Sequence, residues 1–483
     1  MNKQLNQQSR PRVRFAPSPT GYLHIGGLRA AFFNWLFARH TNGVFLLRIE
    51  DTDLERSKPE YTAAILDAFD WVGLQSDEPL VIQSQRIERH KEVIESMLAA
   101  GTAYKCYCTI AELQERLGSS AAQEGSYTKY DEKCRTRVAT AQDEHKPCVV
   151  RFKVPSDITE IAFDDLIHGR LVFDKDQFDD FIIMRSDGSP MYNFVVVVDD
   201  ADMRISHVLR GDDHIANTPK QILLYTACDF IMPQFGHLPM ILGPDGQRLS
   251  KRHAATSVLD YRAQGFLPDA LCNYLVRLGW SHGNQEIFSR EELIQYFSLD
   301  HVGKKAAIFD SAKLEWLNSV YIKQTSAQEL LEYSIRYLEP EFADNKPKAQ
   351  LLGFIELYKE RVKTLRELVE EINSVYTRPN MSVVTPEMEQ WITEKNYQNM
   401  KQLEVYLDSL EDYSVQALMV SIKDFINKQA VTMPEMGKPL RIALTGKTAS
   451  PGVFELLALL GKQESIERLR AFLILIKESL RKH

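Results

Sequence analysis

The chain has 483 residues, of which 44% are hydrophobic and 26% are charged. This composition is that of an ordinary globular protein and excludes a disordered or fibrous chain. The formal net charge of -8 excludes a uniformly basic nucleic-acid coat, although local basic patches could still contact phosphates. At about 150 residues per domain, the length predicts roughly three domains.

The apolar runs of the sequence are short. The longest, 471–476 and 194–198, fall far below the roughly 18 residues needed to cross a bilayer, so we expect no membrane partner. Residues 1–12 are polar and lack the apolar core of a secretory signal. We therefore expect a cytoplasmic protein whose six cysteines need not form disulfides.

The first 50 residues have the pattern strand, loop, helix, strand. A strand-like stretch over 13–16 is ended by the Pro/Gly-rich segment 17–21. Apolar residues then recur at helical spacing over 25–39, and a second apolar stretch covers 44–49. This βαβ unit predicts a parallel sheet that binds ligands at the carboxyl ends of its strands.

The remaining chain changes character twice. After residue 103 the pattern becomes irregular, as in an insertion, until the βα pattern returns at 192–200; beyond about 326 nearly every segment is helical. We therefore expect an α/β fold: a Rossmann-type parallel-sheet domain with an insertion, followed by an all-α C-terminal half. The expected division is 1–102 and 191–256 for the two halves of the sheet domain, 103–190 for the insertion, 257–325 for a helical domain and 326–483 for the helical half.

Two loops carry residues suited to nucleotide binding. In the first, between a strand and a helix, Gly26 and Gly27 let a nucleotide approach free backbone N–H groups, and His24 can donate to an anionic oxygen. The second, 243–252, has cations and a hydroxyl that can close over a triphosphate and neutralise departing pyrophosphate. A turn capped by histidine and a solvated basic turn are the alternatives. Together the loops indicate nucleotide chemistry more strongly than either alone.

The two loops resemble the signature motifs of class I aminoacyl-tRNA synthetases. His24-Ile25-Gly26-Gly27 is similar to the HIGH motif and 248–252 to the KMSKS motif, with Gly27 in place of the final histidine and Arg248 in place of the first lysine. Longer strings are similar to bacterial glutamyl-tRNA synthetases over nearly the whole chain. These strings are RFAPSPTG at 14–21, RIEDTD at 48–53, DD at 199–200 and RGDDH at 210–214.

The resemblance implies a glutamate–tRNA ligase that uses Mg²⁺ with ATP. The α-carboxylate of L-glutamate attacks the α-phosphate of ATP, and the resulting glutamyl-adenylate passes its acyl group to the 3′ end of tRNA(Glu). No protein nucleophile is required, so His24 and Lys251 are the expected catalytic residues, acting by positioning and charge stabilisation. The implied ATP-binding residues are His24, Gly26, Gly27, His214, Arg248, Ser250 and Lys251.

Glutamate carries two carboxylates and one ammonium, so its pocket needs at least two cations and one anion. Arg14 and Arg210 can each hold a carboxylate, and Glu50 can pair with the ammonium. Ser18 and Tyr192 would add hydrogen bonds, and the resemblance favours Arg210 for the side-chain carboxylate. Alternatively, Arg14 and Glu50 simply pair across adjacent strands.

A group of thiols in the insertion resembles a structural zinc knuckle. Cys106, Cys108 and Cys134 supply three possible thiolate ligands for Zn²⁺. The fourth ligand is open: some family members have a histidine where this chain has Thr136, and in other relatives a tyrosine, here Tyr130, completes the site. Three free buried thiols are the alternative.

The helical half carries a possible RNA-contacting ridge. Lys359, Lys363 and Arg366 lie at i, i+4, i+7 beside an apolar stripe, and such a ridge can contact phosphates. By its position in the family, Arg361 is implied as an anticodon reader, with a solvated charged face as the alternative.

The resemblance also assigns roles to whole segments and predicts a monomer. It implies that residues 103–190 bind the acceptor end of the tRNA, that 257–325 contact its stem and that 326–483 bind its anticodon. A paralogue that glutamylates a modified tRNA base would lack the helical half, and a small-molecule adenylyltransferase would not need it. A non-catalytic zinc and RNA-binding module predicts no ATP turnover.

Overall fold

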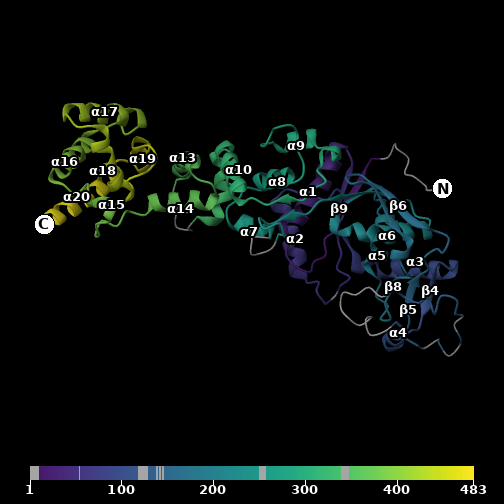
Figure 1. The fold of residues 1–483 in the computed structure, drawn as a ribbon. Coiled ribbons are helices and arrows are strands. Elements are labelled where there is room, and N and C mark those ends of the chain that lie inside the picture. The colour runs from purple at the N-terminus through teal and green to yellow at the C-terminus, as the bar shows by residue number, and fades with distance from the viewer. Residues whose placement is uncertain are drawn as a thin grey trace. The chain divides into compact units, whose positions relative to one another are not determined.

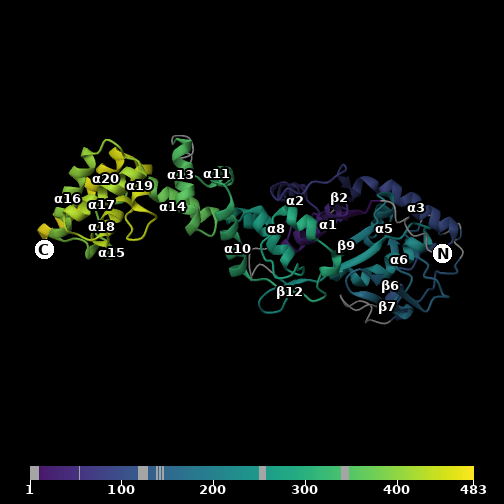
Figure 2. The ribbon, with the colours of Figure 1, turned by 90° about the horizontal axis from the view of Figure 1, so that it is seen from above.

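A computed structural model of residues 1–483 describes residues 10–53, 55–117, 129–137, 140, 143, 146–249, 257–338 and 347–482. The chain forms two compact units (Figures 1 and 2). The N-terminal unit comprises 1–261 and 271–311, and the helical unit comprises 262–270 and 312–483. Among the described residues, no helix is both long enough and apolar enough to span a membrane.

Parallel strands form the centre of the N-terminal unit. One sheet has the order β1-β2-β3 and the other the order β7-β6-β10-β9, with only β7 antiparallel to its neighbour. Strands β1 and β9 lie side by side, since Ser206 N–H donates to Arg12 O at 2.9 Å. The strands are β1 (Arg12–Phe15), β2 (Val44–Ile49), β3 (Val81–Ile82), β6 (Glu160–Asp165), β7 (Gly169–Asp174), β9 (His207–Gly211) and β10 (Gln234–Leu238).

Helices pack on these strands, and the first begins where the sequence predicts. The helix expected over 25–39 is α1, whose N-cap is His24, and the strand expected over 44–49 is β2. The run at 192–200, where the βα pattern was expected to resume, is a helix whose valines are all buried; a short apolar run does not distinguish strand from buried helix. The helices are α1 (Ile25–His40), α2 (Pro59–Trp71), α3 (Ile87–Ala100), α5 (Tyr192–Asp202) and α6 (Thr218–Ala227).

The segment predicted as an insertion contributes to two sheets. Strands β4, β5 and β8 form a separate antiparallel sheet beside α4, whereas β6 and β7 join the sheet of β9 and β10. The domain boundaries drawn from the sequence stay predictions. The bounds are β4 (Ala103–Cys106), α4 (Ile110–Leu117), β5 (Val149–Phe152) and β8 (Ile182–Met184).

Short elements follow the second loop, and helices then continue to the end of the described chain. Their apolar faces build one core in the helical unit. Helix α19 has Gly452 as its N-cap and Gly461 as its C-cap. The elements are β11 (Ile241–Leu242), α7 (Val258–Ala263), α8 (Pro268–Arg277), α9 (Arg290–Tyr296), β12 (Ala307–Ile308), α10 (Ser311–Gln324), α11 (Ala327–Ser334), α13 (Lys348–Tyr358), α14 (Leu365–Tyr376), α15 (Pro386–Glu389), α16 (Glu394–Ser409), α17 (Val415–Lys428), α18 (Met433–Thr445), α19 (Val453–Leu460) and α20 (Lys462–Lys482).

Candidate active site

A cavity of about 620 Å³ opens at the carboxyl ends of β1, β2, β9 and β10 in the N-terminal unit. This is the edge at which a parallel α/β sheet binds its ligands. The cavity brings together all the expected nucleotide- and glutamate-binding residues that the structure describes. They are Arg14, Ser18, His24, Gly26, Gly27, Glu50, Tyr192, Arg210, His214 and Arg248. Ser250 and Lys251 lie outside the described residues.

The first loop ends in a histidine that both caps a helix and faces the cavity. His24 Nδ1 accepts a hydrogen bond from Gly26 N–H at 3.1 Å, which leaves the ring proton on Nε2. Burial lowers the pKa of His24, so the imidazole is neutral near pH 7. A Cβ at Gly27 would lie 3.1 Å from Leu23 Cδ1, so a glycine gives the helix start room to pack closely.

Tyr192 and His214 face each other across the cavity wall. Tyr192 Oη lies 3.0 Å from His214 Nδ1. Burial, together with nearby Arg210, lowers the pKa of His214 to about 4, so this ring is also neutral at pH 7. Arg248, on the second loop, is well exposed and lies 3.3 Å from Asp213 Oδ2.

Two candidate glutamate-binding residues of the cavity, Arg14 and Glu50, do not pair with each other. The buried Arg14 donates from Nε to Asp200 Oδ1 at 3.0 Å, and Glu50 Oε1 accepts from Arg48 Nη2 at 2.9 Å. The alternative of a direct Arg14–Glu50 pair is therefore wrong for this structure. Within the described part of the chain, no hydrogen bond occupies the Nη atoms of Arg14 or the Oε2 atom of Glu50, so these atoms remain for a ligand.

Arg48 and Asp200 link Arg14 to Glu50 through hydrogen bonds, and neither residue was predicted to have a role in the site. Arg48 is fully buried, and its Nη1 donates to Asp200 Oδ1 at 2.7 Å while its Nε and Nη2 reach Glu50. Both residues stand inside strings that carried the family resemblance, but their contact spans 152 residues. Only the pairing of β1 with β2 and the placement of α5 bring them together.

Arg210, on β9, is buried and lines the same cavity as the other glutamate-binding candidates. Its Nη2 donates to Thr218 Oγ1 at 2.8 Å and its Nε to His237 Nε2 at 3.2 Å. Its third donor group, Nη1, is buried without a hydrogen-bond partner among the described residues. Burial lowers the pKa of Arg210, so an anion in the cavity would be a favourable counter-ion for its guanidinium.

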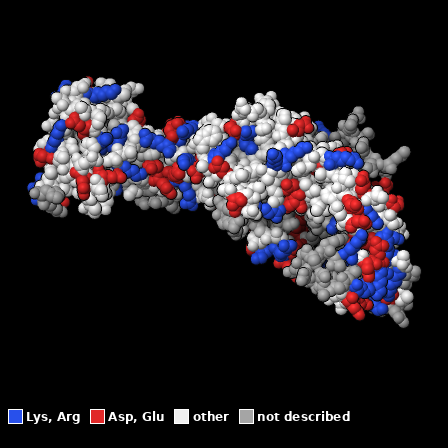
Figure 3. All heavy atoms as spheres, in the orientation of Figure 1, with Lys and Arg blue, Asp and Glu red and all other residues white. Residues whose placement is uncertain are grey.

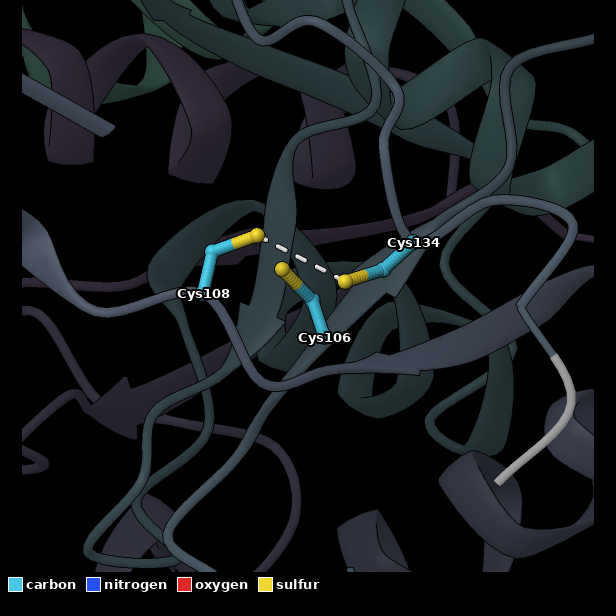
Figure 4. A group of neighbouring side chains, drawn as sticks. All are labelled: Cys106, Cys108 and Cys134. Carbon is cyan, nitrogen blue, oxygen red and sulfur yellow. Dashed lines mark hydrogen bonds between the residues drawn. The ribbon is translucent and has the colours of Figure 1, made fainter. Parts of the chain in front are cut away.

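The thiols expected as zinc ligands lie together in the N-terminal unit. The sulfur atoms of Cys106, Cys108 and Cys134 all lie within 4.8 Å of one another and point toward a common centre (Figure 4). Tyr130 Oη is 3.3 Å from Cys106 Sγ and 3.7 Å from Cys108 Sγ. Zinc bound by thiolates at about 2.3 Å requires sulfur separations near 3.8 Å, so this donor set fits a tetrahedral Zn²⁺ site.

The basic ridge predicted in the helical unit does not exist as one helical face. The expected helix breaks at Val362, between α13 and α14, although its apolar stripe is buried as expected. Lys359 is buried against Glu356 at 2.8 Å, and Lys363 pairs with Glu315 at 3.0 Å. On the face in Figure 3, Lys and Arg are interspersed with Asp and Glu on both units.

The candidate anticodon reader lies at this break. Arg361 is exposed at the end of a single 3₁₀ turn, Lys359–Arg361, that follows α13. A residue at such a break projects from irregular backbone rather than from a regular helical face. This exposure is compatible with both interpretations of Arg361, an anticodon contact and a solvated charged face.

Comparison with known proteins identifies the family. The model described as "tRNA synthetases class I (E and Q), catalytic domain" matches residues 11–316, and "Anticodon binding domain" matches residues 325–473. The chain is 47% identical over 459 residues to a glutamate–tRNA ligase of Geobacter sulfurreducens, covering 95% of this chain and 97% of the relative. The chain belongs to the glutamate–tRNA ligase family.

Other relatives agree with this assignment. A glutamate–tRNA ligase of Thermodesulfovibrio yellowstonii is 45% identical over 463 residues, covering 95% of this chain and 98% of the relative. The crystal structure of a glutamate tRNA ligase from Elizabethkingia meningosepticum in complex with its amino acid superposes with a TM-score of 0.85 at 31% identity, covering 96% of this chain and 99% of that chain. The predicted family, fold class, enzyme class and function are thus confirmed.

Proposed function

We propose that the cavity binds L-glutamate and ATP side by side and that the chain transfers the activated glutamate to tRNA(Glu). The observation that carries the proposal is the charge pattern of the cavity: two buried arginines and one buried glutamate line the same space, and Arg210 Nη1 has no hydrogen-bond partner among the described residues. Glutamate has the complementary pattern of two carboxylates and one ammonium. Buried charges of this kind are stable only with a partner, so the ligand completes the site.

Within this proposal, Arg210 holds the side-chain carboxylate, Arg14 the α-carboxylate and Glu50 the ammonium. Ser18 and Tyr192 line the same cavity and supply further hydrogen bonds. Hydrogen bonds from Arg48 and to Asp200 fix the orientation of Arg14 and Glu50. Such fixed donors favour the reaction because they need no reorganisation when glutamate and ATP meet.

The nucleotide would lie against the glycines at the start of α1. The N-terminus of this 16-residue helix and the Nε2–H of His24 can stabilise negative charge on the phosphates. Gly26, Gly27 and His214 line this part, and the second loop with Arg248, Ser250 and Lys251 would cover it. Mg²⁺ bound with ATP supplies additional neutralisation of the phosphates when present.

We further propose that Cys106, Cys108, Cys134 and Tyr130 hold a structural Zn²⁺. Arg116 Nη2 lies 3.4 Å from Cys108 Sγ, so its guanidinium can stabilise the charge of a zinc-bound thiolate. A closed four-ligand site would fix β4 to the chain around Cys134. Its function is then to shape the part of the enzyme expected to bind the tRNA acceptor end.

The helical unit is proposed to bind the anticodon, with Arg361 among the contacts. The match of an anticodon-binding family model to residues 325–473 supports this role. The exposure of Arg361 allows a contact with a base edge or a stacked base. The enzyme is proposed to act as a cytoplasmic monomer.

Aminoacylation with radiolabelled glutamate and separately purified glutamate and glutamine tRNAs tests the proposed function. We expect charging of the glutamate tRNA, and the glutamine tRNA reports how strictly the anticodon is read. In the same assay, Arg210→Gln should raise the KM for glutamate by at least about tenfold, because a hydrogen bond to a charged group is lost. Absence of charging by folded protein, or an unchanged KM in Arg210→Gln, would contradict the proposal.

A further inference from the structure

Behind Arg210, three neighbouring parallel strands contribute a chain of hydrogen bonds. The strands β6, β10 and β9 are adjacent, and their register places His237 directly opposite Arg210. Asp165 Oδ2 lies 2.6 Å from His237 Nδ1, and His237 Nε2 lies 3.2 Å from Arg210 Nε. Asp165 and His237 are both buried, and neither lines the cavity. His237 Nε2 also lies 3.0 Å from Thr218 Oγ1, the group that accepts from Arg210 Nη2 at 2.8 Å. The chain Asp165–His237 therefore contacts Arg210 both directly and through Thr218.

The chemistry of its two ends fixes the tautomer of His237. Asp165 accepts through Oδ1 from the backbone N–H groups of Ile167 and His168, each at 2.9 Å. Although burial raises the pKa of Asp165, hydrogen bonds from His237 and these amides outweigh it and hold the pKa below its usual value. A carboxylate only accepts and a guanidinium only donates. His237 must therefore carry its proton on Nδ1 and leave Nε2 free to accept from Arg210.

This arrangement orients Arg210 without neutralising it. Among the described residues Arg210 forms no ion pair, because the carboxylate of Asp165 is separated from it by the width of a neutral imidazole ring. The side-chain atoms Nε and Nη2 are occupied, so the guanidinium plane is fixed and Nη1 is the group left without a partner. A carboxylate bonded directly to Arg210 would instead supply the counter-ion that the ligand is expected to supply.

We propose that Asp165 and His237 are positioning residues that aim Arg210 at the side chain of the amino acid and leave its charge uncompensated, so that the pocket selects a carboxylate over an amide. This inference rests on the proposed role of Arg210 in glutamate binding. It makes β6, a strand of the segment predicted as an insertion, a contributor to amino-acid specificity. If the chain of bonds only ties three strands together, changing it would lower stability without a selective effect on glutamate.

Asp165→Asn separates these two outcomes. The asparagine Oδ1 can still accept from the two backbone amides, while its Nδ2 donates to His237 Nδ1 and moves the ring proton to Nε2. The Nε2–H of His237 can then donate to Thr218 Oγ1 but can no longer accept from Arg210 Nε, which loses its partner. We expect the KM for glutamate to rise about 10- to 100-fold, with the KM for ATP and the melting temperature nearly unchanged. Asp164→Asn, at the exposed neighbouring position of β6, is the matched control and should match the wild type.

A second pair of variants tests the acceptor directly. His237→Gln can place an amide oxygen near the position of Nε2, whereas the shorter side chain of His237→Asn reaches only the position of Nδ1. We expect the Gln variant to retain most of the preference for glutamate over glutamine and the Asn variant to lose it, measured by tRNA-dependent ATP–pyrophosphate exchange with each amino acid.

The controls distinguish failure of this inference from failure of the proposed function. If Arg210→Gln loses glutamate binding but folded Asp165→Asn and His237→Asn keep wild-type KM values and selectivity, the positioning role is wrong and the role of Arg210 stands. If Arg210→Gln also binds glutamate normally, both are wrong. Equal rises in the KM for glutamate and for ATP would indicate a purely structural role and overturn the inference.

Discussion

Replacing Arg48 with methionine tests whether one guanidinium holds the buried acids beneath the cavity. Arg48 is 0% exposed and bonds to Glu50 Oε1 at 2.9 Å and to Asp200 Oδ1 at 2.7 Å. Methionine reaches about as far as Nε of arginine, so the change removes the guanidinium with its charge and hydrogen bonds and keeps the packing of the methylene chain.

The expected loss of stability follows from the carboxylate charge that stays buried in the variant. At an effective dielectric constant near 20, unit charges 4 Å apart attract by about 4 kcal/mol, and the cost of burying Arg48 offsets much of this attraction. Removing Arg48 leaves Glu50 buried without its ion-pair partner, whereas Asp200 keeps its bond to Arg14. An uncompensated buried charge costs about 3–5 kcal/mol. For a unit of about 300 residues, an unfolding entropy of about 2.1 cal/mol/K per residue predicts that the melting temperature falls by about 5–8 °C.

Scanning calorimetry at pH 7 measures the effect, with Arg56→Met as the control. Arg56 forms an even shorter contact, 2.6 Å to Asp53 Oδ2, but its side chain is 74% exposed. A solvated pair contributes little, so this variant should melt within about 2 °C of the wild type. If Arg48→Met melts as high as Arg56→Met, the argument that burial rather than distance decides the strength of these pairs is refuted.

The remaining predictions concern pH, chemistry and metal. Burial raises the pKa of Glu50 although Arg48 opposes it, so removing Arg48 should raise that pKa further above the unfolded value of 4.5. The folded Arg48→Met variant then binds more protons than its unfolded state, and its deficit in melting temperature should shrink as the pH falls from 7 to 5; a constant deficit would contradict this. His24→Ala should lower kcat about 100- to 1000-fold with little change in the KM for glutamate, as stopped-time assays of adenylate formation can check. Purified protein should contain one equivalent of zinc by mass spectrometry, and Cys108→Ser should reduce that content; wild-type protein without zinc would exclude the metal site.

Much of the local structure could be predicted because it depends on neighbouring residues. The βαβ start, the helix after His24 and the strand 44–49 each follow from apolar spacing and from glycine or proline at the ends. The residues of the two loops and the glutamate pocket could also be named, because these short segments carry the family's motifs. The cavity then contains every one of them that the structure describes.

Other predictions failed where one pattern fits two structures. The apolar stripe from Phe354 to Ile372 is buried as expected, yet it belongs to two helices, because burial spacing does not show whether the backbone continues through Val362. In the same way, the valines of 192–200 suit both a buried strand and a buried helix.

The sequence by itself determined the family, the local elements and which charged residues meet the ligand. Only the tertiary structure decided which side chains support them: Arg14 meets Asp200 across 186 residues, and Asp165 meets His237 across 72. The physical reason is that periodicity reports which face of an element is buried, whereas these contacts depend on the order and register of parallel strands that are distant in the chain.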